Sequence, residues 1–297
     1  MLVSIITPSY NQGEYLEDTI LSVLNQDYPE IEYIVIDGGS SDNSVDVILK
    51  YAERISYWVS EPDKGQADAI NKGFRKSRGN LICWINSDDL LYPDFVSTRV
   101  KQFLNNPGTD FIYGDVDQGI SPGEKRLRKG AQTDYKKMLI SLNVPVPQQS
   151  AMWRRNLVDR VGPLDEQWQV ILDREYFMRI ARSCAIKYIP GPVAFFRNHE
   201  RSKSVEQWRK WADELERYYN DLFSSGSTPE YEPLKSRALS RMYFTCAKIC
   251  EDCNDMPDRK RYLALSKAVN RSCYLKLGSL NAFRHYFLTI KKKLSWE

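Results

Sequence analysis

Polar side chains that could bind an anion follow four apolar segments in the first third of this 297-residue chain. They occupy residues 7–11, 37–42, 61–65 and 86–89, and they include carboxylates, hydroxyls and a lysine. One such loop would be weak evidence, because Asp, Gly and Ser form turns in many proteins. Four loops at equivalent positions predict one site for a polar, anionic ligand.

The loop at 86–89, Asn86-Ser87-Asp88-Asp89, carries the strongest chemical signal. Its two adjacent carboxylates repel one another, and a cation relieves that repulsion. Carboxylate oxygens suit Mg²⁺ or Mn²⁺, which keep coordination positions open for substrate phosphates. Such an ion would neutralise a diphosphate leaving group. The alternative is structural, with Asp88 or Asp89 capping a helix that begins near Pro93.

Alternating strand and helix signals position these loops. The apolar runs predict strands at residues 2–7, 31–37, 55–60, 81–86 and 111–115, with segments of helical periodicity between them. Strand and helix repeated in this way predict an α/β fold, with a mostly parallel sheet and helices on both of its faces. In such sheets ligands bind at the carboxyl ends of the strands, where these loops lie.

The pattern loosens beyond residue 119. A helix is expected at 173–182, and short strands are expected at 186–189 and 193–196, separated by Pro190-Gly191-Pro192. From residue 206 onward the periodicity is helical, at 206–223, 233–250 and 257–277, and the expected linker is residues 224–229.

Composition narrows the functional classes. A net charge of +3 and a hydrophobic share of 42% are typical of a globular protein and predict no nucleic-acid partner. The basic residues at 125–129 and 291–293 face either phosphates or solvent. No stretch approaches the roughly 20 apolar residues of a membrane span, and the short apolar N-terminus lacks a basic flank, so a cytoplasmic location is expected.

Two features of the C-terminal third leave alternatives open. Cys246, Cys250 and Cys253 have a spacing that suits either zinc or the core of a helix. Aromatic and aliphatic residues between 283 and 290 recur at helical spacing beside the lysines at 291–293. This pattern predicts either a peripheral contact with the inner face of a membrane or a helix packed on the protein.

The strings at residues 4–11, 35–42 and 86–89 resemble the nucleotide-binding half of family-2 glycosyltransferases with the GT-A fold. The string Ser60-Glu61-Pro62-Asp63-Lys64-Gly65, followed by Asp68, strengthens the resemblance. The resemblance is specific over roughly the first 115 residues and looser to about residue 205. It implies an inverting, metal-dependent enzyme that transfers a sugar from a nucleotide-diphosphate donor, by family habit a UDP-sugar, to an acceptor hydroxyl.

The resemblance also implies roles for individual residues on the donor side. Asp37 would accept a hydrogen bond from the base, and Asp88 would hold Mn²⁺ or Mg²⁺ against the diphosphate. Asn86 stands where the family usually has Asp, and Asp89 is a second candidate metal ligand. The donor-binding residues implied are Thr7, Pro8, Tyr10, Asn11, Asp37, Lys64, Asp68, Asn86 and Ser87.

The family's catalytic base lies at an Asp before a helix with aromatic residues and an Arg, and Asp173 matches that position, although Leu172 replaces an often acidic residue. A carboxylate at a helix N-terminus stays ionised and can take the acceptor proton. Glu175 is the rival base, and helix capping is the alternative role for Asp173.

The acceptor side and the late loop complete the expected site. The segment containing Gln148, Gln149 and Trp153 looks like the acceptor side, and His199 lies in a loop that could reach the metal or diphosphate. The expected organisation is a donor half at 1–115, an acceptor and catalytic half at 116–205, and a helical extension at 206–297.

The expected acceptor is a saccharide or a lipid-linked saccharide, in cell-surface polysaccharide or lipid-linked oligosaccharide synthesis. Two rival functions remain open, a nucleotidyltransferase and a catalytically degenerate sugar- or nucleotide-binding protein. A nicotinamide-binding enzyme is disfavoured, since Ser9-Tyr10-Asn11-Gln12-Gly13 replaces the glycine-rich turn after the first strand.

Overall fold

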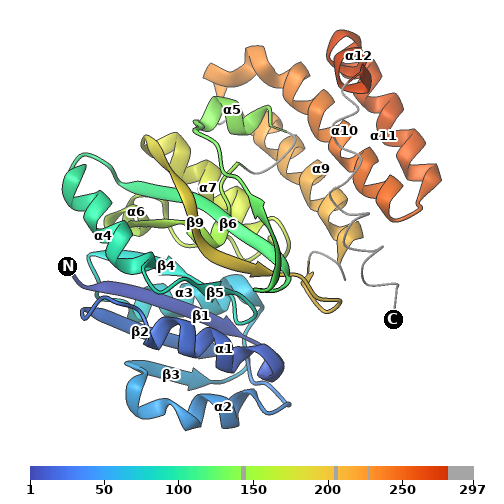
Figure 1. Ribbon diagram of the computed structural model, residues 1–297. Coiled ribbons are helices and arrows are strands. Elements are labelled where there is room, and N and C mark those ends of the chain that lie inside the picture. Colours follow the sequence, from blue (N-terminus) through green and yellow to red (C-terminus); the bar gives the residue numbers. More distant parts are fainter. Residues whose placement is uncertain (142–144, 204–206, 227, 280–297) are drawn as a thin grey trace. The chain divides into compact units, whose positions relative to one another are not determined.

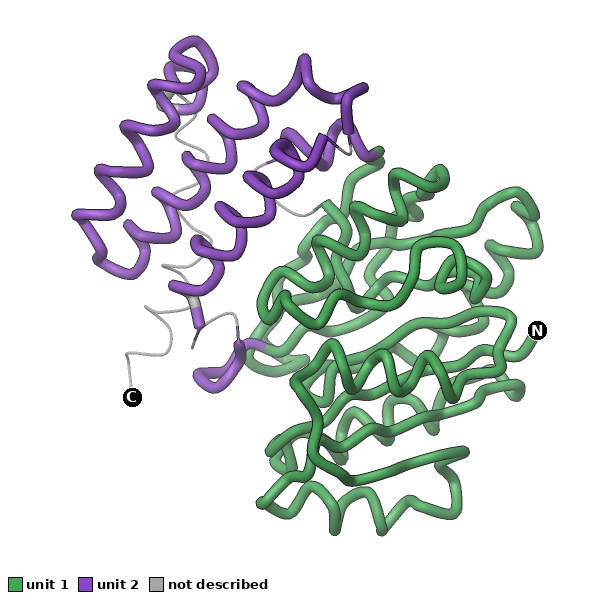
Figure 2. The backbone as a smooth tube through the Cα atoms, turned by 180° about the vertical axis from the view of Figure 1, so that it is seen from behind, with its two compact units in different colours: residues 1–134, 145–197 green, residues 135–144, 198–297 purple. Residues whose placement is uncertain are grey.

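The computed structural model describes residues 1–141, 145–203, 207–226 and 228–279 (Figure 1). The chain forms two compact units, one of residues 1–134 and 145–197 and one of residues 135–144 and 198–297 (Figure 2). The predicted helical extension begins at residue 206. The predicted division stays a prediction, and the second unit also includes the described residues 135–141 and 198–203.

A nine-stranded sheet forms the centre of the first unit in the part of the chain that the structure describes. Its order is β3-β2-β1-β4-β8-β6-β9-β5, and β7 pairs with β6. The strands are β1 (Val3–Ser9), β2 (Ile31–Asp37), β3 (Tyr57–Ser60), β4 (Leu81–Trp84), β5 (Leu90–Leu91), β6 (Phe111–Ser121), β7 (Glu124–Arg128), β8 (Met152–Arg154) and β9 (Ile186–Arg197).

The predicted parallel strands are confirmed for β1 to β4. Beyond β4 the order changes, because β8 inserts antiparallel between β4 and β6. The prediction of two strands at 186–189 and 193–196 is wrong, since β9 runs through the Pro190-Gly191-Pro192 segment. Its pairing with β6 shifts register there, and Gly191 adopts a φ of +112°, so the strand accommodates the two prolines at an irregularity.

Helices cover both faces of the sheet. Two 3₁₀ turns, η1 (Ala52–Arg54) and η2 (Gln148–Ser150), accompany them. The helices of this unit are α1 (Gly13–Leu24), α2 (Ser44–Lys50), α3 (Gln66–Lys76), α4 (Phe95–Asn105), α6 (Asn156–Val161) and α7 (Leu172–Ser183).

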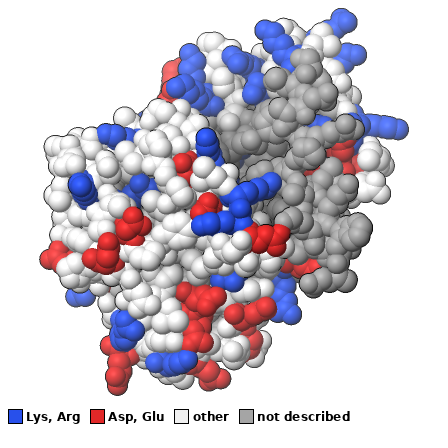
Figure 3. All heavy atoms as spheres, in the orientation of Figure 1, with Lys and Arg blue, Asp and Glu red and all other residues white. Residues whose placement is uncertain are grey.

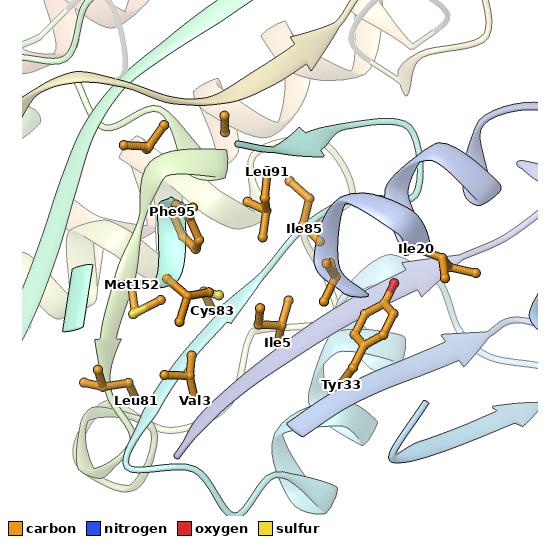
Figure 4. Close-up of a cluster of buried hydrophobic side chains, with 14 of the residues drawn as sticks. Val3, Ile5, Ile20, Tyr33, Leu81, Cys83, Ile85, Leu91, Phe95 and Met152 are labelled. Carbon is orange, nitrogen blue, oxygen red and sulfur yellow. The ribbon is translucent and has the colours of Figure 1, made fainter. Parts of the chain in front are cut away.

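Alternate residues of the strands face opposite helices, as the pleat requires. On one face, Val3, Ile5 and Cys83 are buried with Ile20 of α1 and Phe95 of α4 (Figure 4). Because side chains from strands and helices interdigitate here, this cluster fixes the angle at which α1 lies on the sheet.

The opposite face carries an aromatic cluster. Trp84 of β4 and Trp153 of β8 meet edge to face, with ring centroids 5.4 Å apart. Phe177 of α7 stacks on Trp84 at 5.6 Å. On α3, a Cβ at Gly73 would lie 2.5 Å from Ile6, so glycine is needed for α3 to approach β1 this closely. The cluster therefore packs α7 against the same sheet that carries the polar loops.

The second unit is helical in its described part. It contains α5 (Tyr135–Leu139), α9 (Trp208–Ser224), the 3₁₀ segment η3 (Pro229–Leu234), α10 (Lys235–Asp252), α11 (Met256–Val269) and α12 (Arg271–Ser279). The helix expected at 257–277 is interrupted at Asn270, whose backbone is extended. Its side-chain oxygen accepts a hydrogen bond from the Cys273 N–H at 2.9 Å and so caps the start of α12.

The described helices include none that is long and apolar enough to cross a membrane. The residues predicted to contact a membrane, 283–293, lie outside the described part of the chain. Figure 3 shows acidic and basic side chains interspersed among the described residues of one face. Lys125, from the predicted basic group, pairs with the buried Asp117 at 2.7 Å, so its charge is compensated within the protein.

Candidate active site

The polar loops gather at the carboxyl ends of β1 to β4, as predicted. In the order β3-β2-β1-β4, the chain runs outward from β1 to β2 and β3 and then crosses back to place β4 on the other side of β1. Ligands bind at such a switch point. The first two loops are joined by hydrogen bonds. The Asn11 N–H donates to Ser40 Oγ at 2.8 Å, and the Ser41 N–H donates to Asn11 Oδ1 at 2.8 Å.

The side chains that follow β1 divide between surface and core. Tyr10 is 61% exposed, and Asn11 next to it has a φ of +51°, which turns the chain sharply. Thr7 is fully buried, and its hydroxyl lies 3.1 Å from the Tyr33 hydroxyl. Pro8 is also buried. The Thr7 side chain therefore belongs to the core, and the expected role of Thr7 in donor binding stays a prediction.

Asp37 is a fully buried carboxylate that organises the loop after β2. It accepts hydrogen bonds from the Gly39 and Ser40 N–H groups and from the hydroxyls of Ser40 and Ser60, at 2.5–3.1 Å. Charge-assisted bonds of this kind make a buried carboxylate tolerable and hold the loop in one shape. The predicted contact of Asp37 with a base remains a prediction.

The loop after β3 leads into α3 through Gly65, whose φ of +117° suits glycine alone. Asp68, in the first turn of α3, accepts the Lys64 N–H at 3.2 Å and lies 3.8 Å from the Lys72 ammonium. The Lys64 side chain is 80% exposed, and its ammonium lies 3.7 Å from Glu166. Lys64 thus offers an exposed positive charge beside this edge of the sheet, which fits an anionic ligand.

Asn86 and Asp89 form a closed turn after β4. The Asp89 N–H donates to the Asn86 carbonyl at 3.1 Å, and Asn86 Nδ2 donates to Asp89 Oδ2 at 3.2 Å. Ser87 is buried and Asp88 is half-buried. The first residue of α4 is preceded by Asp94 as its cap residue, so neither Asp88 nor Asp89 caps that helix.

Asp89 differs from Asp88 in having no exposed surface. Its Oδ1 accepts the Arg197 N–H at 2.9 Å, and its Oδ2 accepts Gln149 Nε2 at 2.9 Å. Burial, followed by the nearby Asp88 charge, raises the pKa of Asp89 well above its ordinary value. Because both oxygens already accept hydrogen bonds inside the protein, Asp88 is the better of the two expected metal ligands.

The expected acceptor-side residues point inward. Gln148 Nε2 donates to the Trp84 carbonyl at 2.8 Å, and Gln149 binds Asp89, so both amides support the 86–89 turn. Trp153 has no exposed surface and stacks on Phe111 with ring centroids 5.7 Å apart. The Trp153 ring therefore belongs to the core, and its expected place on the acceptor side stays a prediction.

Asp173 is the second residue of α7 and is half-buried. The N-cap residue is Ile171, so Asp173 is not the helix cap, and its Oδ1 accepts the Arg174 N–H at 2.7 Å. Burial raises the pKa of Asp173, and this effect outweighs the positive charges of Arg128 and Arg174. The expectation that the helix end keeps Asp173 readily ionised is thus opposed by burial, which makes the carboxylate a stronger base.

Glu175, the rival base, is held by Arg179. The Arg179 guanidinium donates to both Glu175 oxygens, at 2.6 and 2.9 Å, and also to the Val161 and Pro163 carbonyls. Burial raises the pKa of Glu175 despite this pairing. A carboxylate engaged on both oxygens is poorly placed to take a proton, so the geometry favours Asp173.

The start of α7 is linked to the donor loops. Asn71 of α3 exchanges two hydrogen bonds with the Leu164 backbone, at 2.8 and 2.9 Å. A Cβ at Gly65 would lie 3.0 Å from the side chain of Gln169. The segment 164–171, which leads into α7, therefore lies against the loop that contains Lys64.

His199 belongs to the second unit, where its carbonyl accepts the Ser202 N–H at 3.1 Å. Its predicted contact with the metal or diphosphate stays a prediction. The described residues contain no cluster of three or more His, Cys, Asp or Glu side chains arranged to hold a metal ion. Cys246 and Cys250 are buried, and the Cys246 thiol contacts the Ala212 carbonyl and Met242 within the helical unit.

Sequence reasoning missed the side chains that support the 86–89 turn from outside. Thr19 Oγ1 of α1 donates to the Asp89 carbonyl at 2.8 Å, and Ser22 and Gln26 bind the chain at 91–96. Arg197 Nε donates to the Asp88 carbonyl at 3.0 Å. The polar residues at 19, 22 and 26 recur at helical spacing, and this signal could have indicated a polar contact of α1.

Comparison with known proteins decides the family. Residues 4–163, more than half of the chain, match the family described as Glycosyl transferase family 2. This chain belongs to glycosyl transferase family 2. An uncharacterized glycosyltransferase of Mycobacterium tuberculosis is 34% identical over 185 residues, which cover 61% of this chain and 70% of that relative. A PGL/p-HBAD biosynthesis glycosyltransferase of Mycobacterium bovis is 27% identical over 66% of this chain and 76% of its own length.

Solved structures show that this family-2 chain has the GT-A fold. A mannosyltransferase from Pyrobaculum calidifontis, in complex with GDP-Man and Mn²⁺, has a TM-score of 0.64 at 19% identity, covering 97% of this chain and 82% of that one. S. aureus TarS 1-349, in complex with UDP-GlcNAc, has a TM-score of 0.57 at 16% identity, covering 96% and 93%. In the longer TarS chain, the match spans 55% of that protein.

Proposed function

We propose that this family-2 glycosyltransferase transfers a sugar from a nucleotide-diphosphate donor, a UDP-sugar, to an acceptor hydroxyl with inversion at the anomeric carbon. The observation that carries the proposal is the gathering of the loops after β1 to β4 at the topological switch point, with the start of α7 linked to them. The donor is supported by the TarS complexes with UDP and UDP-GlcNAc.

In this proposal, the residues at the carboxyl ends of β1 to β4 have separate roles in donor binding. The rigid loop around Asp37 would bind the base, while Lys64 would contribute positive charge towards the diphosphate. Asp88 would hold Mn²⁺ or Mg²⁺, whose charge stabilises the diphosphate leaving group. A single carboxylate fits such an ion, because these cations take much of their coordination from phosphate oxygens and water.

Asp173 would act on the acceptor. A carboxylate with a raised pKa accepts a proton more strongly once it is ionised, and the acceptor hydroxyl loses its proton as it attacks. A base on the side opposite the leaving group allows one displacement, which inverts the anomeric carbon. The acceptor in this proposal is a saccharide or a lipid-linked saccharide, used on the cytoplasmic side in cell-surface polysaccharide or lipid-linked oligosaccharide synthesis.

The test is calorimetric titration of UDP and GDP with and without Mn²⁺, followed by donor hydrolysis and transfer assays. We expect UDP to bind more tightly with Mn²⁺, and Asp88→Asn to remove that gain while circular dichroism remains unchanged. Metal-dependent binding that survives in Asp88→Asn would contradict the assignment of Asp88. Binding without hydrolysis or transfer to any saccharide acceptor would favour a degenerate nucleotide-binding protein.

A further inference from the structure

Asp89 is tied to parts of the chain that are far apart in sequence. Its carboxylate has no exposed surface and accepts from Asn86 of its own turn, Gln149 of η2 and the Arg197 backbone of β9. Its carbonyl accepts from Thr19 of α1. A buried carboxyl group is costly unless hydrogen-bond partners surround it, so its bonds specify where each of these segments lies.

Asn86 is oriented by the same group. Its Nδ2 faces two acceptors, Asp89 Oδ2 at 3.2 Å and Gln148 Oε1 at 3.5 Å, and its Oδ1 accepts Gln66 Nε2 at 2.8 Å. An aspartate at position 86 would keep the bond from Gln66. It would also lose the N–H that Asn86 donates and place an oxygen against Asp89 Oδ2, so that two acceptors meet in the interior.

These contacts explain a residue that departs from the usual family pattern. An Asp at position 86 would be the expected choice if both ends of the turn bound a cation. Here Asp89 faces the protein interior, and the asparagine amide at 86 donates a hydrogen bond that an aspartate carboxylate could not. The two positions therefore work as one amide–carboxylate pair.

We propose that Asp89 is a positioning residue for the metal-binding turn, and that the amide of Asn86 is required because it pairs with Asp89. Asp88 lies between the two members of this pair, and its own carbonyl accepts from Arg197 Nε. The pair thus fixes the direction of the one carboxylate of the turn that remains partly exposed. The part of this proposal that concerns Asp88 rests on the proposed function.

The test compares Asn86→Asp, Asp89→Asn and the double variant Asn86→Asp/Asp89→Asn in the full chain. The single variants place two carboxylates or two amides in contact, whereas the double variant exchanges the members of the pair. Each protein is measured for Tm and for the Kd of UDP with Mn²⁺, at a temperature where circular dichroism shows that it is folded. Asp88→Asn is the reference for loss of the metal ligand with the pair intact.

We expect Asn86→Asp to lower the Tm and to weaken metal-dependent UDP binding by about 10- to 100-fold, as for other groups that orient a metal ligand. The double variant should recover part of both quantities, because the bond between positions 86 and 89 is restored while the new amide at 89 also meets Gln149 Nε2, which donated to Asp89. Unchanged or tighter binding in Asn86→Asp would overturn the proposal, because it would show an added metal ligand instead of a broken pair. A lower Tm with unchanged affinity would overturn the positioning role.

A result that refutes the proposed function differs from a result that refutes the pairing of Asn86 with Asp89. A parent protein that binds no nucleotide with Mn²⁺ would refute that function and the link to Asp88. In that case the recovery of Tm in the double variant still decides whether Asn86 and Asp89 form a pair.

Discussion

The loops after β1 to β4 and the segment from 145 to 175 both supply polar residues, but they use them differently. In the loops, polar side chains bind their own backbone, as Asp37 does with the N–H groups of Gly39 and Ser40. In the later segment, Gln148 and Gln149 reach away from their own turn to bind Trp84 and Asp89. The loop after β2 is thus largely held by its own bonds, whereas the 86–89 turn and the later segment support each other through the bond between Gln149 and Asp89.

The comparison distinguishes side chains with a structural role in the site from side chains that could take part in the reaction. Of the later segment's expected residues, Gln148, Gln149 and Trp153 are occupied in the interior. Arg179 binds both oxygens of Glu175, whereas the half-buried Asp173 accepts the Arg174 N–H on one oxygen and has a raised pKa. We therefore expect Asp173 to be the one catalytic residue among the expected residues of the later segment.

The largest expected effect is therefore on the transfer rate, when Asp173 is changed. Asp173→Asn should reduce the transfer rate by about 10²- to 10⁴-fold, the usual contribution of a general base. UDP affinity should remain unchanged, because the residues proposed to bind the donor lie on other loops. Steady-state kinetics and calorimetry check both parts. A larger loss of rate in Glu175→Gln would show that the other carboxylate is the base.

The same substitution should stabilise the fold at neutral pH. Burial raises the pKa of Asp173 in the folded chain, so the folded state binds this proton more tightly than the unfolded chain does. The stability that the protonated Asp173 contributes is lost as the pH rises from the ordinary carboxyl pKa of about 3.9 through the raised pKa of the folded state. Asparagine keeps the bond from the Arg174 N–H and carries no charge. The Tm of the Asp173→Asn variant should exceed that of the parent at pH 7, and the difference in Tm should shrink towards pH 4.

The sequence was sufficient to predict the parallel strands and the loops at their carboxyl ends. Apolar runs followed directly by residues such as Asp37 and Asp88 are a local signal, and the alternation of strand and helix determines which ends meet. The antiparallel insertion of β8 was not predictable in this way, because Met152–Arg154 is short and its partners are distant. Long-range pairing leaves little trace in local periodicity.

The direction of individual side chains was the other limit. Trp153 and Gln149 carry atoms suited to sugar recognition, and nothing local shows that they point into the protein. Asp88 and Asp89 look equivalent in sequence, yet the donors that bury Asp89 come from residues 60 and 108 positions away. Roles that depend on such distant partners require the structure.

An intermediate effect is expected at the ion pair of α7. Arg179→Gln removes the guanidinium that binds both Glu175 oxygens and leaves a carboxylate that is only 9% exposed. We expect a loss of about 1–3 kcal/mol, lower than for a fully buried pair because Arg179 is 30% exposed. Denaturant unfolding at pH 7 measures it. Glu175→Gln should cost less, since burial already raises the pKa of Glu175.

The pH dependence of that variant gives a second check. Without Arg179 the pKa of Glu175 should rise further, because burial would act without the opposing charge. The folded state would then bind the proton more tightly than the unfolded chain, so Arg179→Gln should regain stability relative to the parent as the pH falls from 7 towards 4.5. A deficit that is constant with pH would show that the ion pair contributes little.

The smallest effect is expected at Asp18 of α1, the helix that follows the loop after β1. Its carboxylate lies 2.9 Å from Arg197 Nη2, but its side chain is 58% exposed, and such a pair contributes about 0–1 kcal/mol. Arg197 keeps its backbone bond to Asp89 and its Nε bond to the Asp88 carbonyl when Asp18 is changed. Asp18→Asn should therefore keep the Kd of UDP with Mn²⁺ within about twofold, by the small worth of an exposed pair. Because it removes a carboxylate close to the turn without touching its internal bonds, it is the matched control for Asp88→Asn. A loss in Asp18→Asn as large as that in Asp88→Asn would mean that general negative charge at this edge, and not the Asp88 carboxylate, governs metal-dependent binding.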